Sequence, residues 1–174
     1  MYKIKLFFLL ISFFFFSTNL YAESKVAYIN IDLVLSESIP SKSLFSQLKL
    51  IEEKQIKKIK DEETKLKDEE KKILATKNII SKDEFNKNVN SFKKKVDTHR
   101  KSKEDNIQNL KQKRNKEILR FFKLINPIIE KIMAQNSIGI LIEKKNIFIA
   151  KSNYDITVIV IDEINKSVKN FLIE

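Results

Sequence analysis

The sequence predicts an α+β fold in which a long antiparallel helical hairpin, a coiled-coil-like arm, projects from a small β-body. Helical periodicity runs through residues 41–134 with one interruption near 76–81. Short runs rich in β-branched and aromatic residues lie on both sides of this region. At about 1.5 Å per residue the two helices would extend roughly 55 and 80 Å, whereas a globule of this chain length is roughly 40 Å across. The helices therefore have to project from the rest of the chain.

Residues 1–22 predict a cleavable signal peptide. Lys3 and Lys5 form a basic start, residues 6–16 are apolar except for Ser12, and Ala22 is a small residue at the end. A transmembrane anchor is the alternative, but this apolar run is well short of the roughly 20 residues that span a bilayer. We therefore expect secretion, and a fold made by the chain from residue 23 onward.

The body is expected from residues 23–40 and 135–174. Residues 25–31 are short and rich in β-branched and aromatic side chains, which predicts a buried strand. Asp32 is predicted to cap a short helical stretch over residues 33–37.

The first arm helix is predicted from about residue 41 to 77, because no glycine or proline interrupts it. Ile59, Leu66 and Ile73 repeat every seven residues within it. About one apolar residue per heptad is too thin a stripe to pack deeply against a core. The acidic pairs Glu62-Glu63 and Glu69-Glu70 are expected to be solvated, since adjacent residues on a helix point apart.

The second arm helix is predicted from residue 81 to 134. Ser81 and Glu84 form a capping box at its start, which leaves residues 76–80 as the turn. Pro127 is expected to kink this helix. Spacings of three and four alternate along most of its inward positions, as an antiparallel hairpin requires: Phe85, Val89, Phe92, Val96, His99, Lys103, Ile107, Leu110, Ile118, Phe121 and Ile125.

After residue 137 the pattern returns to that of strands. Residues 138–142 and 147–150 are strand-like runs joined by a polar turn, which predicts a hairpin. Asp155 is predicted to cap a last helix whose apolar face carries Ile156, Ile159, Val160, Ile164, Val168 and Phe171. A body of this size has open sheet edges and little core, so self-association is expected to cover them.

The composition predicts a binding or structural protein and not an enzyme. The chain has one glycine, no cysteine and one histidine. It therefore lacks a glycine-rich phosphate loop, a thiolate nucleophile or disulfide framework, and a multi-histidine metal site. We expect no catalytic residue, no metal and no cofactor.

The positive charge is concentrated on the predicted arm. Residues 42–123 hold 25 basic and 14 acidic side chains, whereas the rest of the chain after residue 22 holds 7 and 9. Four interpretations fit such an excess: a field that attracts unfolded polypeptide, an anionic lipid surface, a nucleic-acid patch, or a solvated helix face. Secretion argues against nucleic acid.

The order of these segments resembles that of the Skp/OmpH family of periplasmic chaperones, over essentially the whole mature chain. The family's opening strand and short helix are similar to Lys25-Val26-Ala27-Tyr28-Ile29-Asn30 and Val34-Leu35-Ser36-Glu37-Ser38. Its closing hairpin and helix are similar to Ile140-Leu141-Ile142, Asn146-Ile147-Phe148-Ile149-Ala150, Asp155-Ile156-Thr157 and Val160-Ile161. The family usually has a small residue, often glycine, where this chain has Ser41.

This resemblance implies a β-body that is completed by trimerisation, with three helical hairpins around a cavity. It also implies an ATP-independent periplasmic holdase that keeps unfolded outer-membrane β-barrel proteins soluble. The implied partners are such unfolded proteins, further copies of the chain in a homotrimer, and an anionic lipid or lipopolysaccharide surface, but no nucleic acid. The alternative function is a structural coiled-coil scaffold or adaptor of the envelope, which would show fuller seam positions than the first helix has.

Two groups of residues are the expected sites. Client contact is expected on the arm, where the apolar members fit a hairpin core equally well: Leu66, Ile73, Phe85, Val89, Phe92, Lys93, Lys94, Lys95, Arg100 and Lys101. Contact between subunits is expected in the body: Val26, Tyr28, Ile29, Ile140, Ile142, Ile147, Phe148 and Ile149. His99 is expected to be packed or partly exposed, not a metal ligand, because no second ligand lies nearby in the sequence.

Overall fold

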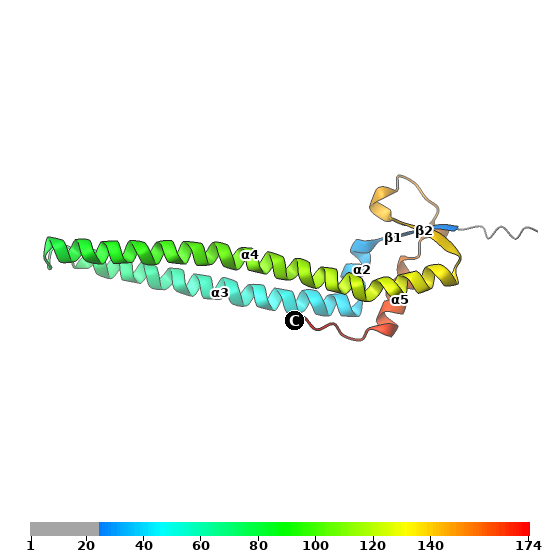
Figure 1. Cartoon of the computed structure of the whole chain (residues 1–174), viewed down its shortest axis with the longest axis horizontal. Helices are drawn as coiled ribbons and strands as arrows, with labels where there is room; N and C mark the ends of the chain where they lie inside the picture. Colours follow the sequence, from blue (N-terminus) through cyan, green and yellow to red (C-terminus); the bar gives the residue numbers. More distant parts are fainter. Residues whose placement is uncertain (1–24) are drawn as a thin grey trace, which may run out of the picture.

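The computed structural model describes residues 25–174, so the predicted signal peptide lies outside the described residues. The elements in order are β1 (Lys25–Ile29), α2 (Ile31–Glu37), α3 (Ile39–Ala75), α4 (Lys82–Gln135), β2 (Ile138–Glu143), η1 (Lys144–Asn146), η2 (Ser152–Tyr154) and α5 (Thr157–Ser167). Helices α3 and α4 lie side by side as an arm that projects from a small body made by the other elements (Figure 1). The predicted fold class is confirmed. Closure of the body by self-association stays a prediction.

The ends of the arm helices follow local capping chemistry. The Ser81 hydroxyl accepts a hydrogen bond from the Glu84 backbone N–H at 3.2 Å, so the predicted start of α4 is confirmed. Helix α3 begins at Ile39, slightly earlier than expected, because Pro40 fits the first helical turn, where its missing N–H costs nothing.

The seam between α3 and α4 is half-buried along most of its length. Phe85, Val89, Phe92, Val96 and His99 are all partly covered, as the spacing predicted. Within residues 45–116 no side chain is fully buried, because two helices alone can cover only one face of each other.

Two predicted seam positions lie at the edge of the seam. Ile107 is 52% exposed and Lys103 is also exposed, while Asn106 takes the partly covered position. A straight α-helix has 3.6 residues per turn, so a strict alternation of three and four drifts out of the seam within a few turns.

The prediction for Pro127 is met only in part: the residue lies inside α4, but the helix continues on both sides of it. Pro127 is exposed. The carbonyl group that loses its backbone partner can therefore be solvated.

Strands β1 and β2 form a two-stranded parallel sheet, with Tyr28 opposite Ile142. The whole arm is thus the connection between two neighbouring strands. The predicted hairpin of β2 with residues 147–150 is wrong for the single chain, where these residues form no strand. The polar residues of η1 turn the backbone away after β2, and no other strand within residues 25–174 offers them a ladder.

The short helix α2 is capped by Asn30, and the prediction of Asp32 as its cap is wrong. The Asn30 Oδ1 atom accepts the Leu33 N–H at 3.1 Å from an extended backbone position. Asp32 lies in the first helical turn, where its charge still favours the positive end of the helix dipole.

The core lies where α2, α5 and the base of the arm meet. Its members are Ala27, Ile29, Val34, Leu44, Phe121, Ile125, Ile129, Ile132, Ile156, Val160, Ile164 and Phe171. The N-cap position of α5 is Ile156, so the prediction of Asp155 as the cap is wrong by one residue, although its carboxylate accepts the Thr157 N–H at 2.9 Å. Val168 and Phe171 were expected on that helix but lie beyond its end, and Phe171 reaches the core from an extended segment.

Candidate functional site

Ion pairs connect the two arm helices at their middle. Lys95 Nζ lies 2.6 Å from Glu69 Oε1, and Lys103 Nζ lies 2.7 Å from Glu63 Oε1. The hydrogen bond from Lys103 lowers the pKa of the Glu63 carboxyl from its ordinary value. One acid of each acidic pair therefore bridges the helices, so the prediction that both pairs are merely solvated is wrong in part.

His99 lies between two carboxylates of the opposite helix. Its Nδ1 atom is 3.3 Å from Glu62 Oε2, and its Nε2 atom is 3.8 Å from Glu63 Oε1. The expectation of a partly covered histidine is met. Residues 25–174 contain no group of three or more His, Cys, Asp and Glu side chains that could hold a metal ion.

Open grooves with apolar floors run along the arm between α3 and α4. The groove nearest the tip has a volume of about 460 Å³. It brings together five of the predicted client-contact residues, Ile73, Val89, Phe92, Lys93 and Arg100. Leu66 and Lys95 line a second groove, beside His99, of about 370 Å³.

The remaining predicted client-contact residues are not part of these two grooves. Lys94 lies on a polar outer face with Asn90 and Asp83. Phe85 is half-buried in the seam near the turn, and Lys101 is exposed on the outer side.

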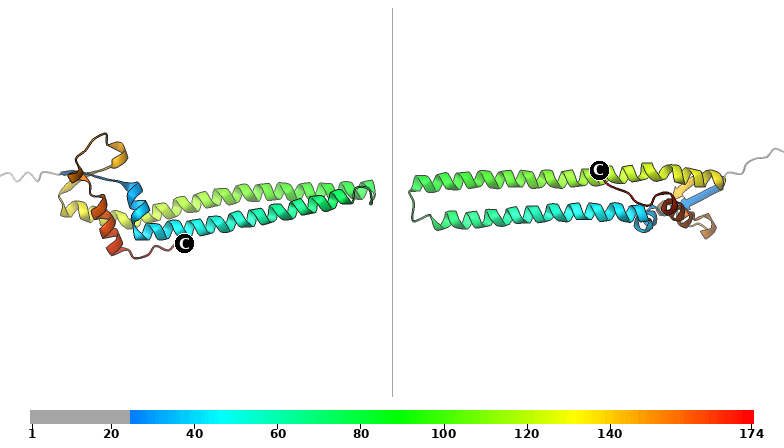
Figure 2. Two further views of the ribbon diagram at one scale, coloured as in Figure 1. Left: turned by 180° about the vertical axis from the view of Figure 1, so that it is seen from behind. Right: turned by 90° about the horizontal axis from the view of Figure 1, so that it is seen from below.

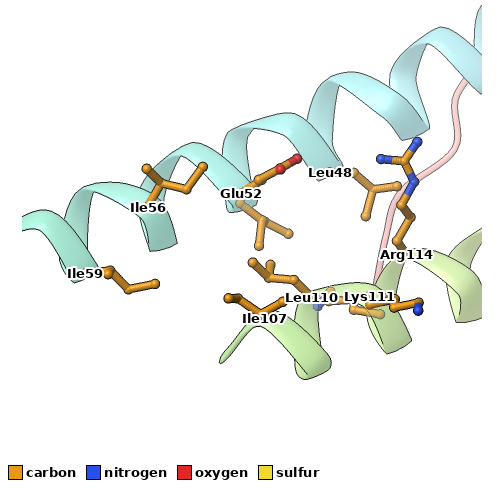
Figure 3. Close-up of a pocket in the computed structure, with 10 residues that line it drawn as sticks. Leu48, Glu52, Ile56, Ile59, Ile107, Leu110, Lys111 and Arg114 are labelled. Atoms are coloured by element: carbon orange, nitrogen blue, oxygen red, sulfur yellow. The ribbon is translucent and has the colours of Figure 1, made fainter. Parts of the chain in front are cut away.

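A third groove, near the base of the arm, was missed by the site prediction. It has a volume of about 340 Å³, and Figure 3 shows Leu48, Ile56 and Ile59 of α3 facing Ile107 and Leu110 of α4 across it. Basic side chains form much of its rim: Lys111, Lys113 and Arg114. The helical spacing of Leu48 and Ile51 was the signal that could have located it.

The body carries a second concentration of uncovered apolar side chains. Among the predicted subunit-contact residues Val26, Ile140, Phe148 and Ile149 are exposed, with Phe148 at 103% of its reference area. Ile142 and Ile147 are half-buried and line a hollow of about 500 Å³ beside β1.

Tyr28 and Ile29 do not belong to that uncovered surface, because both are buried within the single chain. Burial raises the pKa of the Tyr28 phenol, and the nearby Asp155 carboxylate raises it further. Tyr28 still lines the hollow beside β1 together with Ile142 and Ile147, whereas Ile29 belongs to the core.

None of the helices within residues 25–174 is both long enough and apolar enough to cross a bilayer.

Known proteins resemble this chain in family and in fold. The family described as "Outer membrane protein (OmpH-like)" matches residues 25–164. The crystal structure of a Caulobacter crescentus protein, described as a candidate outer membrane chaperone (OmpH-like), superposes with a TM-score of 0.80. The two are 18% identical, over 86% of this chain and 88% of that one. No curated protein matches the sequence significantly.

Proposed function

The chain belongs to the OmpH-like family of outer membrane proteins, and from this premise we propose that it is an ATP-independent holdase of the periplasm. Its clients are unfolded outer-membrane β-barrel proteins, which it keeps from aggregating. The observation that carries the proposal is the arm itself, a basic hairpin whose apolar grooves stay open along its length.

Such an arm fits an unfolded barrel strand. Those strands alternate apolar and polar residues, so in water they expose apolar surface and aggregate. An arm region with an excess of 11 positive charges attracts acidic segments over a distance. The shallow grooves then add many weak apolar contacts, none of which demands a particular client sequence.

The working form is a homotrimer. Phe148 and Ile149 are uncovered in the single chain, and within the described residues β2 has no partner on its outer edge, while the outer edge of β1 has only an isolated bridge between Tyr28 and Asp155. Exposed apolar side chains next to open strand edges favour association with further copies. Three bodies joined in this way would hold three arms around a common space.

The test is an aggregation assay with the purified mature protein. A urea-unfolded outer-membrane barrel is diluted into buffer, and turbidity is followed with and without the chain, while light scattering gives its oligomeric state. We expect a trimer that suppresses turbidity at a small molar excess. A monomer, or no suppression at several-fold excess, would contradict the proposal.

A shortened-arm variant is the matched control. Equal lengths of α3 and α4 are removed beyond the Glu63–Lys103 ion pair, which leaves the body and the base of the arm intact. This variant should remain trimeric and lose most of its suppression. Equal suppression of aggregation by both proteins would indicate that the body, and not the removed part of the arm, binds the client.

A structural scaffold of the envelope is the second candidate function. The thin seam of α3 argues against it, because permanent coiled coils fill their core positions with apolar side chains. An anionic lipid or lipopolysaccharide surface is a further partner of the basic arm, and vesicle cosedimentation with neutral and anionic lipids tests it.

A further inference from the structure

We infer that the base of the arm is a peptide-binding socket, and that the chain's own carboxy-terminal segment occupies it as an internal ligand. The segment, called the tail, is residues 168–174. The socket is formed by Ser43 and Gln47 of α3 and by Arg120 and Phe121 of α4. It is separate from the arm grooves and does not depend on the holdase proposal.

The tail runs back along the base of the arm without forming a helix or strand. It leaves α5 at Val168 in an extended conformation and lies against α3 and α4 in two different views (Figures 1 and 2). The family match ends at residue 164, before the tail begins.

One aromatic side chain anchors the tail. Phe171 is only 4% exposed, and its ring meets that of Phe121 edge-on at 5.8 Å between centroids. The guanidinium carbon of Arg120 lies 4.5 Å from the Phe171 ring centroid, a cation–π contact. The next residue, Leu172, is 66% exposed and Ile173 is half-buried against the core, so Phe171 is the one fully buried side chain of the tail.

The other contacts are mainly to the tail backbone. The Gln47 amide donates from Nε2 to the Phe171 carbonyl at 2.6 Å and accepts at Oε1 from the Ile173 N–H at 3.3 Å. Arg120 Nη2 donates to the Leu172 carbonyl. Hydrogen bonds to the backbone do not depend on the side chains and therefore recognise almost any sequence, as they do where sheet edges bind peptides. Specificity then rests on the aromatic ring.

Arg120 is held in place independently of the tail. Its Nη1 atom lies 3.1 Å from Oε2 of Glu117, whose side chain is completely buried on the same helix. A second carboxylate, that of Glu174 in the tail, also lies 3.1 Å from Nη1. When the tail leaves, Arg120 therefore still has a carboxylate neighbour on its own helix.

The chemistry of the partner follows from the tail. The socket fits an extended peptide with an aromatic residue, accessible backbone on its carboxyl side, and an acidic side chain three residues further on. Because the tail is covalently attached, its effective concentration is on the order of millimolar. A partner in solution therefore binds weakly until the tail is released.

The experiment compares two neighbouring tail substitutions in the full chain. The probe is a labelled peptide with the sequence of residues 168–174, VKNFLIE, and binding is read by fluorescence anisotropy. Phe171→Ala removes the anchor and should raise the apparent affinity for the probe by at least about tenfold over the unsubstituted chain. The matched control Leu172→Ala changes an exposed residue and should bind as the unsubstituted chain does. A probe with alanine in place of its phenylalanine should not bind.

A folded Phe171→Ala protein that binds the probe no better than the unsubstituted chain would overturn the inference. If that variant unfolds, hydrogen exchange on the unsubstituted chain decides instead. Excess probe should speed exchange of the Ile173 amide, which loses Gln47 when the tail is displaced, and unchanged exchange would also overturn the inference.

A reversible disulfide between the tail and α3 provides a third test of tail displacement. The chain has no cysteine, and the Ser43 hydroxyl lies 2.7 Å from Oδ1 of Asn170. Ser43→Cys with Asn170→Cys places two thiols at these neighbouring positions, and a disulfide between them, verified by mass spectrometry, would fix the tail. We expect probe-driven exchange at Ile173 in the reduced form and none in the oxidised form. Equal exchange in both forms would count against displacement of the tail.

Discussion

At the scale of single residues, ion pairs between α3 and α4 connect the two helices of the arm. The sequence predicted these pairs only in part. His99 was predicted to be partly covered, because its spacing from Val96 puts it in the seam. Its two carboxylate neighbours, Glu62 and Glu63, could not be predicted. Which residue of α3 faces which residue of α4 depends on the length of the turn and on the mismatch between 3.6 residues per turn and the spacing of the seam. Neither can be derived from a local sequence pattern.

Ser41 is another residue whose role becomes clear only in three dimensions. It is fully buried, and its hydroxyl donates to the Leu35 carbonyl at 2.5 Å. The backbones of α2 and α3 therefore approach closely at this point. A small residue fits there, which is the physical reason that serine can stand where the resembled family often has glycine.

The Glu63–Lys103 pair predicts a pH dependence of arm stability. The pKa of Glu63 is lowered in the folded chain by the hydrogen bond from Lys103, so its carboxylate stabilises the fold above the unfolded pKa of about 4.3. That contribution is lost as the pH falls through the lower folded value. Urea midpoints followed by circular dichroism should fall between about pH 5 and about pH 3, and less steeply in Glu63→Gln.

Glu104→Gln is the control for this prediction. Glu104 is exposed on α4 and no ion pair of it occurs within the described residues, so its substitution should leave the pH profile unchanged. Parallel pH profiles for the unsubstituted chain and Glu63→Gln would show that the Glu63–Lys103 ion pair does not cause the pH dependence.

At the scale of elements, the helices were predictable and the strands only in part. The start of α4 follows from a capping box, a signal contained in four consecutive residues. Residues 147–150 were predicted as a strand because they are short and apolar. A strand also needs a hydrogen-bonded partner strand, and a local sequence pattern does not show whether one is present in the same chain. The parallel pairing of β1 with β2 was likewise missed, since it joins segments at opposite ends of the arm.

The cap of α4 gives an element-level prediction. Ser81→Ala removes the acceptor for the Glu84 N–H and should destabilise the start of α4 by about 1 kcal/mol. Ser91→Ala, on an exposed position inside the same helix, should be neutral or slightly stabilising. Hydrogen exchange of amides 83–88 measures both, and equal exchange in the two variants would show that the cap contributes nothing to the tip.

At the scale of the whole molecule, length and charge were the informative signals. The predicted helices are longer than a globule of this chain length is wide, so the sequence predicted a projecting arm. The charge counts showed that the excess of basic residues lies on this arm. The apolar grooves of the arm are the part of the site that could be predicted least. They depend on how far the two seams separate, and this separation is set by side chains from both helices at once.

The distribution of charge predicts a salt dependence of client capture. If the arm attracts unfolded polypeptide electrostatically, raising NaCl to about 0.5 M should weaken capture, because screening shortens the reach of exposed charges. The proposed apolar contacts between bodies should persist, so light scattering should report the same oligomeric state at both salt concentrations. Capture that is insensitive to salt would assign client binding to the apolar groove floors.

The long connection between β1 and β2 also sets the order in which the molecule can form. Neighbouring strands of the body are separated in the chain by both arm helices, so the sheet has a high contact order, whereas contacts near the arm turn are local. Local contacts form first and distant pairings last. During synthesis β1 is made first. Its partner strand β2 becomes available only after both arm helices have been made. The arm therefore forms before the sheet that joins its two ends, and the pairing of β1 with β2 is the final step of folding.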